Sequence, residues 1–179
     1  MFKKIIEITE LIEEDRHVQV LTMFTDLWPR FSTAPASTKY HGSYNGGLLD
    51  HTIQVVKASR YLYNFYLDQK KLKTTLESVT FCALVHDIGK IGTKLFNSYV
   101  PETPESLKFT YNKECPQIDH ELLTLFWLNH YRVQLSEEEM AAVYYHAGPY
   151  VDAYKKTAET DLLMILHTAD NLSAKILNI

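Results

Sequence analysis

The stretch Leu84-Val85-His86-Asp87-Ile88-Gly89-Lys90 places a histidine beside an aspartate at the end of an apolar run. Upstream, Val79 and Ala83 recur at helical spacing with His86, which predicts a helix whose apolar face includes the imidazole. Neighbouring residues in a regular helix diverge by about 100°, so they rarely serve one ligand. At a helix end they can approach a metal from two sides, and Gly89 lets the backbone turn away just beyond.

Four further helical patterns each direct a side chain of metal-ligand type toward the interior. Asp170 falls among leucines in the last predicted helix, and three histidines take similar positions in other helices. The predicted stripes are Leu163, Leu166, Asp170, Ser173 and Leu177; His51, Val55, Ala58, Leu62 and Phe65; His120, Leu123, Trp127 and Tyr131; and Ala142, Val143 and His146.

These side chains have two interpretations. Taken singly, a histidine on an apolar face is more often a hydrogen-bonded core residue, and an inward aspartate is often a structural cap. Taken together, five buried polar groups on separate helices would each need a partner of their own. One or two divalent cations would satisfy them all, as in helical bundles that bind metals. The nitrogen and oxygen donors suit Mn, Fe, Ni, Co or Zn better than Mg.

Helical periodicity dominates the chain of 179 residues, which is long enough for one domain with its own core. We therefore predict a single all-α domain over residues 1–179, with accessory helices in 1–29 and a metal-binding core in 41–174. Three prolines make Ile91–Gln117 irregular, and this segment is placed to act as a lid that selects the substrate. Within it, residues 107–111 could form either a short strand or an extended part of the lid.

The predicted helices follow from apolar spacing, capping residues and prolines. They cover 2–14; 17–28, ended by Pro29; 48–68; a helix capped by Thr74 with Glu77 and ending near Gly89; 118–131; a helix capped by Ser136 with Glu139 and ending near His146; and 160–177.

Composition narrows the function further. The formal net charge is −4, which disfavours a binder of duplex nucleic acid. The two cysteines, Cys82 and Cys115, have no disulfide or zinc-finger spacing. The first residues contain no secretory signal, and no stretch is apolar enough to span a bilayer. We expect a cytoplasmic protein without membrane contact, while its oligomeric state stays open.

The ordered residues His51, His86–Asp87 and Asp170 resemble the H…HD…D pattern of the HD-domain superfamily of metal-dependent phosphohydrolases. The flanking sequence is also similar. Its run Gly46-Gly47-Leu48-Leu49-Asp50-His51-Thr52 resembles the sequence found in HD domains of certain 3′–5′ exoribonucleases and relaxase-like proteins. The resemblance implies a metal held by these four residues. Many members hold a second metal through extra histidines, and His120 and His146 match that placement, with Asp87 as the bridge.

The inferred reaction is hydrolysis of a phosphate ester by metal-activated water. Asp87 would bridge the ions or orient the water, and Lys90 would contact the phosphate, unless it is simply a solvated loop lysine. His41, Tyr44 and Lys94 are further candidates for substrate binding, although His41 could equally stabilise its loop. The expected substrate is a nucleotide or short oligonucleotide.

Departures from subfamily patterns leave the substrate open. The segment Tyr145-His146-Ala147-Gly148 carries one histidine and lacks the Gly-Tyr-Pro motif of cyclic-dinucleotide hydrolases, and Asp50-His51-Thr52 differs from the Glu-His-Ser of 5′-deoxynucleotidases. Two alternatives remain at this point: a di-iron oxygenase with the same ligands, or a catalytically silent sensor that binds a nucleotide.

Overall fold

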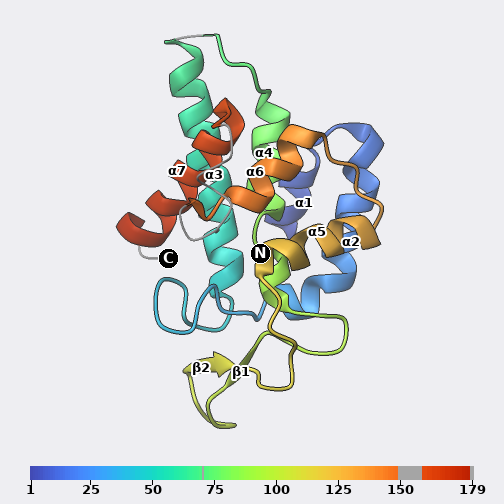
Figure 1. The fold of residues 1–179 in the computed structure, drawn as a ribbon, viewed down its shortest axis with the longest axis vertical. Coiled ribbons are helices and arrows are strands. Elements are labelled where there is room, and N and C mark those ends of the chain that lie inside the picture. The colour runs from blue at the N-terminus through green and yellow to red at the C-terminus, as the bar shows by residue number, and fades with distance from the viewer. Residues whose placement is uncertain (70, 149–158, 178–179) are drawn as a thin grey trace.

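A computed structural model of the chain describes residues 1–69, 71–148 and 159–177. Figure 1 shows helices packed around one another, with a small hairpin of strands at one end. The all-α prediction is confirmed, because the described residues contain a single sheet of two short strands. In chain order the elements are α1 (Phe2–Thr9), α2 (Glu14–Phe31), α3 (Gly47–Leu67), α4 (Leu76–Val85), η1 (Ile88–Ile91), β1 (Tyr99–Pro101), β2 (Phe109–Tyr111), α5 (His120–His130), α6 (Glu137–Tyr145), α7 (Asp161–Leu172) and η4 (Ser173–Leu177).

Helix α4 lies inside the bundle. Every residue from Val79 to Val85 is buried, and the helix packs against α3, α6 and α7. A helix that is apolar on all sides is stable only when surrounded by other elements. Its last turn therefore delivers His86 and Asp87 to the interior, where both side chains are at most 1% exposed.

The N-terminal helices differ from the prediction. Helix α1 ends at Thr9 instead of near residue 14, and α2 begins at Glu14. The predicted stop at Pro29 is wrong, because α2 continues through it to Phe31. Proline removes one backbone hydrogen bond, and this loss is tolerated in a final turn that fully buried Phe31 holds against the core.

The two predicted capping boxes have different outcomes. At α6, the Ser136 hydroxyl accepts from the Glu139 amide and the Glu139 carboxylate accepts from the Ser136 amide, which confirms the box. At α4, the predicted cap Thr74 is wrong, since Thr75 accepts from the Ser78 amide at 3.0 Å. Glu77 instead accepts hydrogen bonds from a distant arginine, so a tertiary contact overrides the local pattern.

Two further segments refine the predicted elements. Of the two alternatives for residues 107–111, the strand is present as β2, which pairs antiparallel with β1 so that Tyr99 faces Tyr111. The last predicted helix changes to a wider π-helical turn at Ser173. The predicted stripe of α3 is wrong at its distal end, where Phe65 is 50% exposed because that end projects past its neighbours (Figure 1).

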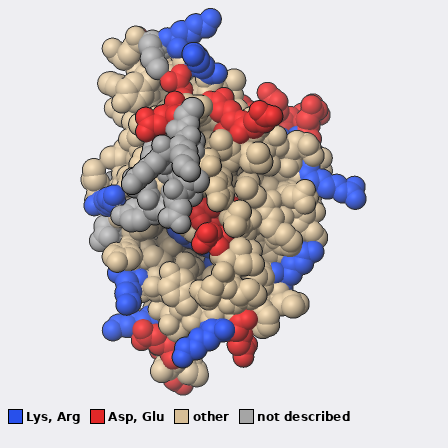
Figure 2. All heavy atoms as spheres, viewed as in Figure 1, with Lys and Arg blue, Asp and Glu red and all other residues tan. Residues whose placement is uncertain are grey.

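Charges are mixed on the face of the molecule in Figure 2. Basic and acidic side chains of the described residues alternate there, and acidic ones gather toward the upper part of the view. None of the described helices combines the length and apolar character needed to cross a membrane.

Candidate metal centre

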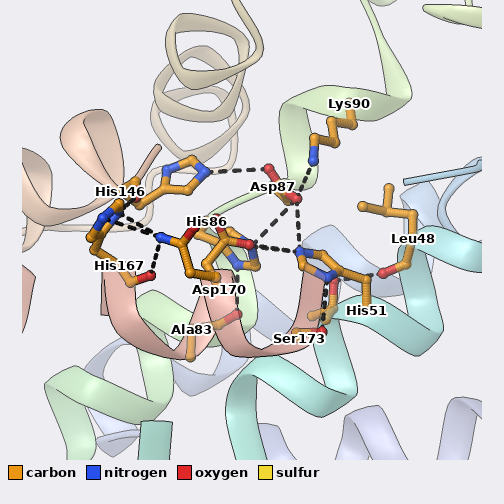
Figure 3. A network of polar contacts seen from close by, with 12 residues as sticks. Leu48, His51, Ala83, His86, Asp87, Lys90, His146, His167, Asp170 and Ser173 are labelled. Atoms are coloured by element: carbon orange, nitrogen blue, oxygen red, sulfur yellow. Dashed lines mark hydrogen bonds and ion pairs between the residues drawn. The ribbon is translucent and has the colours of Figure 1, made fainter. Parts of the chain in front are cut away.

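The first group of predicted ligands meets between three helices (Figure 3). His51 comes from α3, His86 and Asp87 follow α4, and Asp170 belongs to α7. His51 Nε2 lies 3.0 Å from Asp170 Oδ1 and 3.4 Å from Asp87 Oδ2. His86 Nε2 lies 3.3 Å from the same Asp87 oxygen. Four ligands that are up to 119 positions apart in sequence thus share one small volume.

The second group uses the other oxygen of Asp87. Asp87 Oδ1 lies 3.2 Å from His120 Nε2 and 3.4 Å from His146 Nε2. His120 is the first residue of α5, and His146 follows the last residue of α6. One carboxylate therefore connects two donor groups, with one oxygen directed at each.

Hydrogen bonds at the far side of the rings set the imidazole orientation. His86 Nδ1 lies 2.9 Å from the Ala83 carbonyl, and His146 Nδ1 lies 2.6 Å from the Val143 carbonyl. A carbonyl can only accept, so Nδ1 carries the proton and Nε2 of the neutral ring presents a lone pair to the centre. Ser173 Oγ contacts His51 Nδ1 at 3.0 Å, and this hydroxyl can either accept from that nitrogen or donate to it. Such outer partners are characteristic of metal-binding histidines.

The centre fits two divalent cations. Asp87 Oδ1 is buried without a hydrogen-bond partner, and His86 Nε2 faces His51 Nε2 at 3.4 Å. Acceptors that face one another repel unless a cation or a proton lies between them. Metal–nitrogen bonds of about 2.0–2.1 Å place neighbouring ligands roughly 3.0 Å apart in octahedral and 3.4 Å apart in tetrahedral geometry. The contacts of 3.0–3.4 Å within both groups have these separations, whereas His86 Nε2 and Asp170 Oδ1 are 4.0 Å apart.

The protonation states of both carboxylates and of His86 also suit metal binding. Burial alone would raise the pKa of Asp87, but Lys90 and His86 hold it well below its usual value, so the carboxylate is ionised. Burial would also raise the pKa of Asp170, but the hydrogen bond from His51 and the charges of His86, His146 and His51 together lower it. Burial lowers the pKa of His86, which keeps that ring neutral. His51 and His146 differ from His86, because burial lowers their pKa values but hydrogen bonds to Asp170 and Asp87 for His51, and to Asp87 for His146, raise them overall. Ionised carboxylates and neutral imidazoles bind a metal, so an ion would displace any proton held by these two rings.

Gly89 brings the two donor groups together. It lies in the short helix η1, where an added Cβ would come within 2.0 Å of the His120 carbonyl oxygen. Its amide donates to Thr124 Oγ1 at 2.9 Å, and that hydroxyl donates to the His86 carbonyl at 3.0 Å. Close packing of η1 on α5 therefore places His120 beside Asp87.

The loop before α3 brings His41 to the first donor group. The ring centroids of His41 and His51 are 4.7 Å apart, and His41 Nε2 is buried without a hydrogen-bond partner. Burial and neighbouring His51 lower the pKa of His41 to about 4, so its ring is neutral at physiological pH. Gly47 permits this loop path, because a Cβ there would meet the Gly42 carbonyl oxygen at 2.0 Å.

The other three residues predicted to contact the substrate differ in how close they lie to the metal centre. Lys90 Nζ is 2.6 Å from Asp87 Oδ2, so this lysine is part of the centre and is no free loop cation. Tyr44 is exposed and donates to Asp50 at 3.0 Å. The structure does not bring Lys94 to the centre: it is exposed, with Nζ 5.7 Å from the Phe126 ring centroid.

Two hollows of about 250 Å³ each flank Lys90 and Tyr99, which line both. The Arg30 hollow is further lined by Arg30, Thr33, Ala34, Pro35, Asn45, Ile91, Asn97, Val100, Pro101 and Phe109. The His120 hollow is further lined by Ser98, Tyr111, Cys115, Pro116, Gln117, Ile118, Asp119 and His120. Sequence reasoning missed Arg30 and Tyr99, although it expected the segment of Tyr99 to cover the site.

This bundle, with an adjacent His–Asp pair that connects two donor groups, defines an HD-type protein of the metal-dependent phosphohydrolase superfamily. The family model described as the HD domain of Cas3 matches residues 39–174, and the chain belongs to this family. The predicted superfamily is confirmed. The matching family is that of the Cas3 HD domain, whereas the sequence motifs resemble HD domains of exoribonucleases and relaxase-like proteins. No curated protein and no solved structure matches the chain.

Proposed function

We propose that the protein hydrolyses a phosphodiester bond in a nucleotide or short single-stranded oligonucleotide, with two divalent ions that share Asp87. The observation that carries this proposal is the buried Asp87 carboxylate, whose oxygens face separate donor groups at 3.2–3.4 Å. Bound ions would activate water near neutral pH and offset the negative charge of the phosphate. The histidine-rich donor set favours Mn, Fe, Ni, Co or Zn over Mg.

The residues around the ions have separate roles in this proposal. The water oxygen forms a bond to phosphorus, the bond to the leaving ester oxygen breaks, and the leaving oxygen receives a proton. Lys90 lies beside Asp87, where its ammonium can contact a phosphate oxygen. His41, neutral and with a buried unpaired nitrogen, can form one hydrogen bond to the substrate. Tyr44 and Lys94 line neither hollow and remain predictions at the periphery.

A diester fits the surroundings better than a monoester. A phosphodiester carries a substituent on each side of the phosphate, and Lys90 lines two separate hollows. Each is smaller than the roughly 300–1,000 Å³ of a pocket for a whole drug-sized ligand, so each suits a fragment of a longer substrate. The Cas3 HD domains that define the family are nucleases, which also supports a diester.

The proposed substrate is small and single-stranded, and the proposed compartment is the cytoplasm. The test is a screen of product release from mononucleotides, cyclic nucleotides and short oligonucleotides, with Mn²⁺, Ni²⁺, Co²⁺, Zn²⁺, Fe²⁺ or Mg²⁺, under anaerobic conditions. We expect wild type to cleave oligonucleotides and Asp87→Asn to be inactive.

The two alternatives give different results in this screen. Oxygen consumption by an iron-loaded protein that releases no phosphate product would establish the oxygenase. Tight nucleotide binding without turnover under any metal would establish the sensor. Equal activity of wild type and Asp87→Asn would contradict the proposed chemistry.

A further inference from the structure

We propose that the Arg30 hollow is a subsite for a second phosphate of the substrate, next to the phosphate that is hydrolysed. This inference rests on the proposed function, because it assigns the part of a nucleotide strand that lies beside the metal centre. It involves Arg30, Asn45 and Lys90, of which only Lys90 belongs to the centre already described.

The charge of the hollow favours an anion. Arg30 and Lys90 line it, together with the polar side chains of Thr33, Asn45 and Asn97, and none of its lining residues is acidic. The His120 hollow differs, because Asp119 is among its lining residues. The two hollows therefore differ in charge, and the Arg30 hollow is the one that suits the anionic part of a ligand.

Arg30 carries a charge that no carboxylate balances within the described chain. Its guanidinium donates to the carbonyls of Ile91, Thr93 and Phe96 at 2.6–2.9 Å and to Asn97 Oδ1 at 2.7 Å. All four acceptors are neutral, and a guanidinium has five N–H donors, so one donor remains. A half-buried cation without a counter-ion is unfavourable, and an anionic ligand would offset this cost.

The hollow also lies at the required place. Lys90 Nζ is 2.6 Å from Asp87 Oδ2, and the same side chain lines the Arg30 hollow. A strand whose scissile phosphate contacts Lys90 would therefore extend directly into that hollow. Its volume of about 250 Å³ suits a phosphate with part of its sugar.

The experiment compares thymidine dinucleotides with and without a terminal phosphate. Affinities for metal-free protein, which cannot hydrolyse them by the proposed route, are measured by calorimetry for the unphosphorylated, 5′-phosphorylated and 3′-phosphorylated forms. We expect one phosphorylated form to bind wild type about tenfold more tightly than the unphosphorylated form, as for one charge-assisted hydrogen bond. Because no turnover is needed, this result is independent of whether the protein proves to be a hydrolase.

Three variants test the assignment. Arg30→Gln removes the charge, and Asn45→Asp adds a negative charge at an exposed position without disturbing the Arg30 hydrogen bonds. Both should reduce the preference for the terminal phosphate to less than about threefold. Asn129→Asp makes the same chemical change on α5, outside both hollows, and should keep the wild-type preference.

Three outcomes would overturn the proposal. Wild type could bind all three dinucleotides equally. Both test variants could lower the affinity for all three dinucleotides by the same factor, which would show that Arg30 only stabilises the loop that it contacts. Inorganic phosphate could bind as tightly as the phosphorylated dinucleotide, which would identify a site for free phosphate.

Discussion

A buried aspartate that faces the nitrogens of four histidines requires positive charge around it. Asp87 is 1% exposed, and its oxygens lie within 3.4 Å of His51, His86, His120 and His146. Lys90 supplies one positive charge, at 2.6 Å from Oδ2. Two divalent ions would supply the rest, and they explain why Oδ1 has no hydrogen-bond partner.

Lys90 should act on the substrate rather than on the metals. In Lys90→Met we expect both ions to stay bound, because lysine is no ligand, while kcat falls by roughly 10²–10³-fold with the loss of a charged contact to the phosphate. Metal analysis and steady-state kinetics on the same preparation check this. Loss of the metals with the activity would show instead that Lys90 maintains the fold of the centre.

At the scale of residues, the metal ligands could be predicted from the sequence, but the residues around them could not. Polar groups on apolar stripes identified His51, His86 and Asp170, since a buried polar group needs a partner, and Asp87 was identified as the neighbour of His86. Arg30 gave no such signal, because it directly follows Pro29, where the predicted helix ends. Its role depends on carbonyl groups 61–66 positions later in the chain, which local pattern cannot reveal.

At the scale of elements, the contact between η1 and α5 determines the second donor group. Gly89→Ala should push α5 away, since its Cβ would meet the His120 carbonyl oxygen at 2.0 Å and backbone cannot rotate aside. We expect weaker binding of the ion at the second donor group and little change in the affinity of the first donor group for its ion. Calorimetric titration of metal-free protein would measure both, and equal weakening of the two would contradict the assigned role of Gly89.

A buried ionic cluster connects α2, α4 and α6. Arg16 donates to Glu77 at 2.6 Å and to Glu139 at 2.8 Å, and its side chain is 12% exposed. Arg16→Met would keep the packing on Phe81 and leave two carboxylates unpaired. We expect a loss of about 3 kcal/mol in the free energy of unfolding, measured with urea. Lys3→Met is the control, since the exposed Lys3–Glu7 pair should contribute less than about 1 kcal/mol.

The effect of Arg16→Met should depend on pH. Burial raises the pKa of Glu139, but the hydrogen bonds from Arg16 and the Ser136 amide lower it below its usual value. A lowered carboxyl pKa stabilises the fold above the unfolded value of about 4.3. This contribution is lost as pH falls through the lower folded value. The stability difference between wild type and variant should therefore shrink below about pH 4, and a constant difference would contradict the ionic role.

Elements were predictable where local signals agreed with tertiary packing. The Ser136–Glu139 box and the helices that carry the histidines follow from spacing and capping. The cap at Thr74 and the stop at Pro29 failed because Arg16 binds Glu77 and the core binds Phe31. Such contacts between distant residues are absent from local sequence pattern.

At the scale of the whole molecule, metal binding should stabilise the fold. The ligands come from five helices and their ends, so ions bind the folded chain and not the unfolded one. At free metal near 100 times Kd, one ion adds about 2.7 kcal/mol, which corresponds to roughly 5–10 °C in Tm for a chain of this size. Calorimetry with and without a chelator checks this. An unchanged Tm, with unaltered protein concentration, would show that the centre holds no ion.

The number of ions bound per chain tests the central claim most directly. Plasma mass spectrometry of protein equilibrated with Mn²⁺ or Ni²⁺ and freed of excess metal should give two ions for wild type. It should give one for His146→Asn, which removes a ligand of the second group alone, and close to none for Asp87→Asn. A single ion in wild type, or two ions retained in Asp87→Asn, would contradict a centre in which one aspartate joins two metal sites.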